Sequence, residues 1–353
     1  MTRHVTAERL QTLAAGVLGA EGLPPQEAAI VAEMMIEADL LGADGHGIFR
    51  LPRYLERLRA GGFNARPNIR IARERGAMAL VDGDNGFGHL VMKFCADEAV
   101  RRARSHGIGW VGAHHSNHAG AAGVYALIPL AHDMIGFYVA VGSANHMAPW
   151  GGLEMLLSTN PIAVAIPAAG RRPVLLDMAT TVAAYGKVKL AAQRGETMPP
   201  EWMIDAQGNP LTDPARAGEG TLMPIGGPKG YGLALIFGLL AGTLNGAAFG
   251  RDVIDYNHDD SSVANTGHFV VAIDIAAFGD LEHFKAEVAR IGDEIAGSVR
   301  RPGFDAIRLP GERALSVREK RLAHGIPVPP ALLEKLGAIA AACGLPSLQD
   351  QPE

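Results

Sequence analysis

The spacing of apolar residues changes along the chain. In the first seventy positions apolar residues recur at helical spacing, whereas the middle of the chain carries short apolar runs typical of buried strands. Thr6 is a suitable N-cap for a first helix ending near Gly16–Gly22, and Pro24–Pro25 opens a second that Gly42 stops. Further helices are predicted over Phe49–Ala60, His89–Ser105, Ala121–Ala131, Ala179–Gln193, Leu233–Leu244, Leu281–Val299 and Leu332–Cys343. Strands are predicted over Ala77–Val81, Ile108–Ala113, Ile135–Val141, Ile162–Ile166, Val174–Leu176 and His268–Ile275.

The order of these elements predicts an α/β fold. A mixed sheet with its helices is expected over residues 73–305 as the core that holds the ligands. The helical segments 1–72 and 306–353 are expected to pack together beside it as a second, helical domain. No internal repeat or low-complexity linker interrupts this arrangement.

Composition narrows the class of protein. Of the 353 residues 48% are hydrophobic and 20% charged, so most of the chain is able to enter a core. A net charge of −5 provides no basic field for nucleic acid. The apolar run Leu233–Leu244 is too short to span a bilayer and is expected to be a buried helix. Two cysteines in apolar contexts and an N-terminus without a signal peptide favour the cytoplasm, with no membrane partner.

The stretch from Trp110 to Tyr125 is the strongest candidate for a site. A buried strand leads through a histidine-bearing turn into a helix whose first residues are small. Such turns after a strand commonly carry binding and catalytic groups. His118 directly precedes the small residues Ala119–Gly123, and histidine changes charge near neutral pH. His118 is therefore the leading candidate for proton transfer.

The segment Gly107–Gly112 matches the dinucleotide fingerprint G-x-G-x-x-G letter for letter. That fingerprint requires a strand before the glycines and a helix after them. Here a helix precedes and the glycines lie within the predicted strand, so we interpret the match as coincidence.

His114, His115 and His118 are also candidates for metal ligands. No carboxylate or cysteine lies near them in the sequence, and a catalytic zinc site normally needs a third ligand and an ordered second shell. We therefore predict no metal, with His114 and His115 in structural roles.

A second constellation occupies residues 44–54. His46, Arg50 and Tyr54 are spaced by four, so in a helix they share one face. The guanidinium of an arginine binds a carboxylate through two parallel hydrogen bonds. An ordinary basic helix face that includes Arg53, Arg57 and Arg59 is equally compatible with the pattern, and both interpretations stay open.

Three further polar segments are weaker candidates. Ser158–Pro161 and Leu176–Thr181 lie at the ends of predicted strands, where an α/β sheet holds ligands, although Asp177 is also a plausible helix cap. Lys229 is flanked by glycines and suits either a phosphate or a surface turn. Leu309–Arg313 is a polar loop with no local indication of function.

Taken together, these motifs resemble the type-2 malate/L-lactate dehydrogenase family of NAD(P)-dependent oxidoreductases. The segments that carry the resemblance are Ala38–Leu58, Ser116–Gly123, Met147–Gly152, Thr159–Pro167, Leu176–Gly186, Gly226–Gly232 and Arg308–Glu312. The resemblance implies a nicotinamide-binding fold distinct from the Rossmann fold. It also implies a homodimer with the site near the subunit contact.

Carried over by resemblance, His118 is the catalytic acid/base and His46 with Arg50 acts at the substrate. Arg50, Tyr54 and Asn160 are the substrate-binding candidates. The cofactor-binding candidates are Ser143, Asp177, Met178, Ala179, Lys229, Pro310, Gly311 and Glu312. Where the family usually has serine and often an aromatic residue, this chain has Gly45 and Ala119, which suggests a substrate that differs from malate or lactate.

The function predicted in this way is hydride transfer between NAD or NADP, with NAD slightly favoured, and C2 of a 2-hydroxy or 2-oxo acid. The partner is thus a small-molecule carboxylate. Two alternatives stay open: a reductase of cyclic imino acids such as Δ1-piperideine-2-carboxylate, and an inactive nucleotide-binding paralogue.

Overall fold

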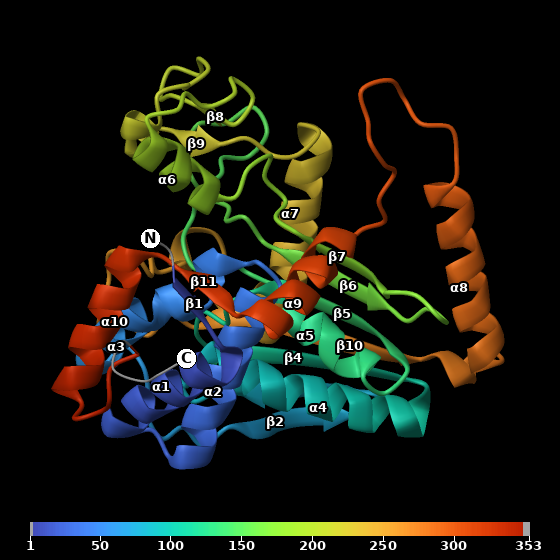
Figure 1. Cartoon of the computed structure of the whole chain (residues 1–353), viewed down its shortest axis with the longest axis horizontal. Coiled ribbons are helices and arrows are strands. Elements are labelled where there is room, and N and C mark those ends of the chain that lie inside the picture. Colours follow the sequence, from blue (N-terminus) through green and yellow to red (C-terminus); the bar gives the residue numbers. More distant parts are fainter. Residues whose placement is uncertain (1–2, 349–353) are drawn as a thin grey trace.

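A computed structural model describes residues 3–348, and a seven-stranded mixed sheet runs through its centre (Figure 1). Only β3 and β4 are parallel, and every other neighbouring pair is antiparallel. The strand order is β2 (Arg70–Arg75), β3 (Met78–Asp82), β4 (Ile108–Ser116), β10 (Thr266–Asp274), β5 (Met134–Ala140), β6 (Ile162–Ile166) and β7 (Val174–Met178). The predicted mixed sheet is confirmed, including all six of its predicted strands.

Two strand predictions need correction. The edge strand β2 was missed, because its residues are almost all polar and exposed and show no apolar alternation. Strand β4 continues to Ser116, so His114 and His115 belong to the strand and the turn begins only at Asn117. Pairing of Asp82 with His114 and of Thr266 with Ser116 extends the strand beyond its apolar part.

Helices cover both faces of the sheet. Helices α4 (Gly88–His106) and α5 (Ala122–Leu130) pack on one face, where Val270 and Ala272 of β10 point. Phe269 and Val271 point to the other face, which α7 (Pro228–Ala241) covers.

The glycines of the fingerprint-like segment are explained by packing. Gly107 ends α4 in a left-handed conformation with φ of 78°. A Cβ at Gly109 would lie 2.1 Å from the carbonyl oxygen of Ala99 in α4, and one at Gly112 would lie 2.1 Å from Oδ1 of Asn245. These glycines allow helix and loop to approach β4 closely. As predicted, a helix precedes them and Gly109 and Gly112 lie within the strand.

The two chain ends pack together. Strand β1 (Arg3–Val5) pairs with β11 (Ile326–Val328), and buried residues from both ends form one apolar cluster. The helices of this part are α1 (Ala7–Ala20), α2 (Pro25–Leu40), α3 (Leu51–Arg59), α9 (Glu312–His324) and α10 (Pro330–Ala342). Helix α9 was not predicted, since its sequence is mostly charged and its buried contact is largely Leu315. The domain boundaries at 72/73 and 305/306 stay a prediction.

Residues after β7 form a small lobe with an apolar cluster of its own, drawn above the sheet in Figure 1. The lobe contains α6 (Tyr185–Arg194), β8 (Met203–Ile204), η3 (Pro214–Glu219) and β9 (Thr221–Leu222). Helix α6 begins six residues later than the predicted start at Ala179, because Thr180 and Thr181 bond their hydroxyls to nearby carbonyls instead.

The remaining elements are α8 (Leu281–Ala296), which projects from the body in Figure 1, and short 3-10 turns. These turns are η1 (Asp44–His46), η2 (Ile48–Arg50), η4 (Thr243–Asn245), η5 (Gly250–Asp252) and η6 (Ile275–Ala277). Helix α7, expected to be buried, exposes Leu233, Ile236 and Leu239 on one face. No helix within residues 3–348 has the length and apolar character that a membrane crossing requires.

Candidate active site

The backbone that carries His118 is fixed from several sides. Asn117 is fully buried, and its Nδ2 donates to Oδ1 of Asn85 at 2.9 Å and to the carbonyl of Gly86 at 3.0 Å. The carbonyl of Asn117 is bonded to Nε2 of His268 at 3.1 Å. The turn after β4 is therefore a rigid support for the side chain that follows it.

The ring of His118 lies among aromatic side chains and a second histidine. Its Nδ1 is 2.7 Å from the hydroxyl of Tyr54, and its ring stacks on His46 with centroids 5.6 Å apart. The centroid of Tyr256 lies 5.3 Å away. The Tyr54 contact occupies Nδ1 and leaves Nε2 as the nitrogen available to a substrate. Tyr54 itself is fully buried, so the structure places this predicted substrate ligand behind His118 as its support.

Burial keeps this group of histidines neutral. Desolvation first, and then the positive charge of Arg50 and the neighbouring histidines, lower the pKa of His118 well below its usual 6.5. Desolvation likewise lowers the pKa of His46 to about 4, of His89 to about 3 and of His268 to about 4. At neutral pH His118 is thus unprotonated and able to accept a proton.

Arg50 is distinguished from the other arginines of its segment by its contacts. Arg57 is fully buried and donates to the carbonyls of Asp259 and Ser262, while Arg53 pairs with Asp260. Arg59 pairs with Glu21. Arg50 donates through Nε to the carbonyl of Gly45 at 2.7 Å, and no carboxylate in residues 3–348 forms an ion pair with it. Arg50 therefore differs from Arg53, Arg57 and Arg59 in its contacts, and its role at a substrate stays a prediction.

A buried carboxyl group shapes the loop that carries His46. Oδ2 of Asp39 accepts from the backbone N–H of Ile48 at 2.7 Å, and a Cβ at Gly47 would lie 2.0 Å from Oδ1. Only glycine permits this close approach. Asp39 is 2% exposed, and desolvation raises its pKa to about 7.

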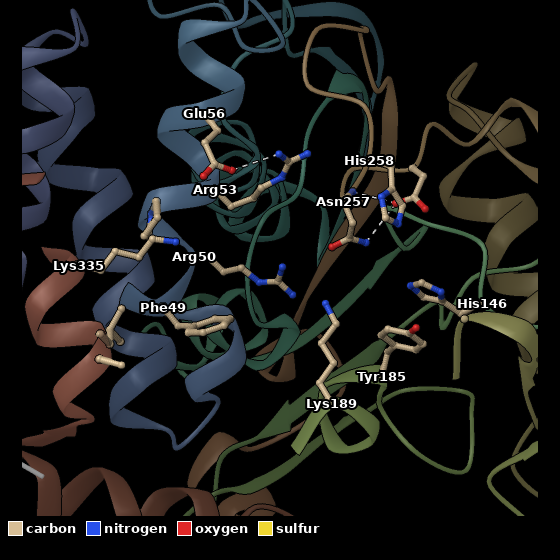
Figure 2. A pocket seen from close by; sticks show the side chains of 15 residues that line it. Phe49, Arg50, Arg53, Glu56, His146, Tyr185, Lys189, Asn257, His258 and Lys335 are labelled. Atoms are coloured by element: carbon tan, nitrogen blue, oxygen red, sulfur yellow. Dashed lines mark hydrogen bonds and ion pairs between the residues drawn. The ribbon is translucent and has the colours of Figure 1, made fainter. Parts of the chain in front are cut away.

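Arg50 lines a cavity of about 720 Å³ between the helices α3 and α10 and the small lobe (Figure 2). His118 is not itself a lining residue, but the positive charge of Arg50, which does line the cavity, acts on its imidazole. The remaining lining residues are Phe49, Pro52, Arg53, Glu56, His146, Tyr185, Lys189, Gly218, Asp255, Asn257, His258, Ala331, Leu332 and Lys335. Such a volume suits a small polar ligand together with part of a cofactor.

Asn160 lies away from this cavity. It is fully buried, Oδ1 accepts from the backbone N–H of Gly142 at 3.1 Å and Nδ2 donates to the carbonyl of Ala234 at 2.8 Å. The structure therefore places Asn160 in the scaffold, where it joins the segment after β5 to α7.

Most of the cofactor-binding candidates lie along β7 or in the turn that follows it. Oδ2 of Asp177 accepts from the backbone N–H of Gly123 at 2.8 Å. Desolvation by the surrounding protein raises the pKa of Asp177, although part of the residue is exposed to solvent. Met178 and Ala179 continue that turn, and backbone bonds from Val182 and Ile225 join it to the segment that precedes Lys229.

The carbonyl of Pro310 accepts from the backbone N–H of Leu175 at 3.0 Å, and Gly311 packs on the same residue. Glu312 pairs with Arg171 at 3.2 Å. Ser143 lies in the segment after β5, where its carbonyl accepts from the backbone N–H of Tyr256 at 2.9 Å. The Pro310–Glu312 loop is thus held against β7, whereas Ser143 is joined to the segment that flanks His118.

One expectation about the exposed histidines is wrong. Nδ1 of His115 lies 3.0 Å from Oδ1 of Asp82, so a carboxylate that is distant in sequence does lie beside them. Asp82, His114 and His115 have possible metal-ligand atoms within 4.8 Å of one another, and His118 is not part of this cluster. Arg70 also pairs with Asp82 at 2.5 Å, so this carboxylate already has two partners.

Several cavity residues were missed by sequence reasoning. His146 stacks on Tyr185 with centroids 4.5 Å apart, and Lys189 lies one turn further along α6. Asp255 and His258 approach from the segment that follows η5. None belongs to a recognisable motif, because three separate segments contribute them. Only the amphipathic spacing of Tyr185 and Lys189 was available as an indication.

A family model described as malate/L-lactate dehydrogenase matches residues 5–337. The chain belongs to this family. A malate dehydrogenase from Pyrococcus abyssi is 38% identical over 98% of this chain and 96% of its own length. Dehydrogenases of this family transfer hydride to a nicotinamide cofactor, so the predicted class of enzyme, an NAD(P)-dependent hydroxy-acid dehydrogenase, is confirmed.

Solved structures agree with this assignment. The sulfolactate dehydrogenase from Methanocaldococcus jannaschii has a TM-score of 0.91 at 36% identity, covering 97% of this chain and 98% of that one. The Δ1-piperideine-2-carboxylate reductase from Pseudomonas syringae pvar. tomato has a TM-score of 0.86 at 29% identity, covering 96% and 100%. The names of relatives include both NAD⁺- and NADP⁺-dependent enzymes.

Proposed function

We propose that this chain oxidises a 2-hydroxy acid at C2, and reduces the 2-oxo acid in reverse, with His118 as the acid/base. The observation that supports this role most directly is the placement of His118, whose Nδ1 is held by Tyr54 at 2.7 Å beside the unpaired guanidinium of Arg50. Arg50 binds the carboxylate next to C2 through its two free terminal nitrogens. His46, whose Nδ1 is buried without a partner, bonds the substrate oxygen.

The proton and the electrons follow separate routes. In oxidation the hydroxyl proton moves to Nε2 of His118, the C2–H bond breaks with its electron pair, and the C2–O bond becomes a carbonyl. The nicotinamide, when bound, supplies the acceptor for that hydride. Binding of the substrate carboxylate to Arg50 cancels a positive charge that disfavours protonation of His118, so the bound substrate itself makes His118 a better base.

The residues around the end of β7 suit a dinucleotide. Lys229, in the first turn of α7, has no carboxylate partner within the described residues and provides a cation for a diphosphate. The open face of Asp177 and the hydroxyl of Ser143 provide hydrogen-bonding groups. A sheet with a single parallel pair supports a binding mode distinct from the Rossmann fold, which uses successive parallel strands.

We also propose a homodimer that covers the exposed apolar face of α7. Leu233, Ile236 and Leu239 are 39%, 54% and 39% exposed on consecutive turns of this helix, which is unusual for a free surface. Analytical ultracentrifugation tests this assembly. Ile236→Glu should shift a dimer toward monomer, whereas a monomeric wild-type protein would contradict the proposal.

The test of the proposed reaction is oxidation of NADH and NADPH by the purified protein with a panel of 2-oxo acids and cyclic imino acids. Turnover of an oxo acid supports the proposal and identifies the preferred nucleotide. Turnover of imines alone would instead favour the reductase activity named for the Pseudomonas syringae structure. No turnover with intact nucleotide binding would favour an inactive paralogue.

A further inference from the structure

The wall of the cavity opposite Arg50 carries a second cation. Lys189 projects from α6 of the small lobe, and Figure 2 shows its ammonium group extending toward the guanidinium of Arg50. Burial, and then the like charge of Arg50, lower the pKa of Lys189, while Asp255 acts in the opposite direction. The two cations are therefore close enough to repel one another.

The carboxylates of the cavity balance only part of its positive charge. Asp255 uses Oδ1 to accept from the backbone N–H of Asn257 at 2.8 Å and from its Nδ2 at 3.2 Å. Glu56 pairs with Arg53 at 3.3 Å. Lys189 has no ion pair among the residues described, and its nearest defined contact is the ring of Tyr185, with Nζ 5.5 Å from the centroid. Asp255 therefore offsets one positive charge, whereas three lining cations, Arg50, Lys189 and Lys335, form no ion pair in the part of the chain that the structure describes. This excess of positive charge indicates a ligand with more than one negative charge.

The lobe holds Lys189 in this position. Tyr185 and Lys189 are one turn apart on α6 and both face the cavity, while Val188 and Ala191 point into the apolar cluster of the lobe. Backbone bonds join the lobe to the segment that follows β7, from Val182 to Met223 at 2.8 Å and from Ile225 to Thr180 at 3.0 Å. The position of this ammonium group is thus set by the fold of the lobe.

We propose that Lys189 determines specificity by binding a second acidic group of the substrate. The substrate is then a dianionic 2-hydroxy or 2-oxo acid, with the carboxylate beside C2 on Arg50 and a distal carboxylate or sulfonate on Lys189. This inference rests on the proposed reaction, because Arg50 is assigned there to the first carboxylate. A monoanionic acid leaves Lys189 unpaired beside Arg50, whereas a dianion neutralises both cations.

The test compares Lys189→Met with wild type on two dianionic oxo acids, oxaloacetate and 3-sulfopyruvate, and on monoanionic pyruvate. We expect kcat/KM for the preferred dianion to fall roughly 10- to 100-fold, as for loss of a hydrogen bond to a charged group, while the value for pyruvate stays within about twofold. Lys189→Arg should restore much of the loss. The ratio between the two dianions distinguishes a carboxylate-binding site from a sulfonate-binding site.

Arg194→Gln is the matched control, because Arg194 is in the same helix but does not line the cavity. An equal loss on pyruvate and on both dianions, or no loss on the dianions, would overturn the proposal. Calorimetric binding of L-malate and L-lactate in the presence of nucleotide gives the same comparison without turnover. A malate preference that Lys189→Met abolishes supports the site even if the proposed reaction fails, and absence of that preference in the wild type contradicts it.

Discussion

His115 and His118 lie three residues apart in the chain, yet their surroundings are opposite. His115 is 47% exposed at its side chain and bonds to Asp82, which also pairs with Arg70. His118 is half-buried against Tyr54, Tyr256 and His46, and the positive charge of Arg50 acts on its ring. The exposed neighbourhood neutralises its own charges, whereas the buried one leaves an unprotonated base and a free guanidinium. The comparison shows that contacts, and not residue type, separate a surface histidine from a candidate catalytic one.

The largest contrast between the two neighbourhoods is expected in turnover. His118→Asn removes the proton acceptor and should lower kcat by about 10²- to 10⁴-fold, with nucleotide affinity unchanged. His115→Asn is the matched control and should leave kcat within about twofold. Steady-state kinetics and fluorescence titration of the nucleotide measure both. Similar losses of kcat in the two variants would show that His118 and His115 do not differ in their importance for turnover.

Arg50→Lys tests whether the guanidinium beside His118 binds the substrate carboxylate. Lysine keeps the charge but loses the two parallel hydrogen bonds of the guanidinium, so KM for the acid should rise roughly 10- to 100-fold with a smaller change in kcat. Arg59→Lys, in the same segment but paired with Glu21, is the control and should not alter KM. An unchanged KM in Arg50→Lys would remove Arg50 from the carboxylate site.

Tyr54→Phe tests the support behind His118. Phenylalanine keeps the ring packing against Phe63 and Phe87 but removes the hydroxyl 2.7 Å from Nδ1. We expect kcat to fall about 2- to 10-fold, as for loss of one hydrogen bond. The acid limb of the pH profile should also move to lower pH, because the imidazolium loses an acceptor. A fall in kcat with an unmoved limb would indicate a purely structural effect.

The smallest expected effect concerns two carboxyl groups, Asp39 in the buried neighbourhood and Asp82 in the exposed one. Burial raises the pKa of Asp39 from 3.8 to about 7, so the folded state favours its protonated form. Stability from this group is present below pH 3.8 and is lost as the pH rises toward 7. Asp39→Asn should therefore lose less stability than wild type across this range, measured as Tm against pH.

Asp82 should contribute to stability with the opposite pH dependence, and Asp82→Asn tests this. Burial raises the pKa of Asp82, but hydrogen bonds from the backbone N–H of Asp84 and from His115 lower this pKa overall. Its contribution is present above pH 3.8 and is lost only as the pH falls below that value. Parallel pH dependence of Tm in the two variants would contradict the burial argument.

Much of the sheet was predictable from the sequence because its strands are apolar and short. The polar edge strand β2 and the charged helix α9 were not predictable, since exposed elements lack the apolar periodicity that predictions use. Tertiary pairing, which no local pattern encodes, extended β4 through His114 to Ser116.

The candidate site divides in the same way. His118, His46 and Arg50 were predicted because spacing and resemblance place them in two short segments. Asn160 and Tyr54 were expected at the substrate, but their polar atoms are used by the scaffold and by His118. Lys189 was missed because only the folding of the small lobe brings it opposite Arg50.

We expect His118 to be a neutral base in the free enzyme, and the pH dependence of kcat/KM for oxidation of the hydroxy acid reports its protonation state. Because burial and Arg50 lower the pKa of His118 well below 6.5, the unprotonated form persists as the pH falls. The profile should therefore stay level from neutral pH down through 6.5 and decline only below it. A decline with its midpoint at or above 6.5 would contradict the account.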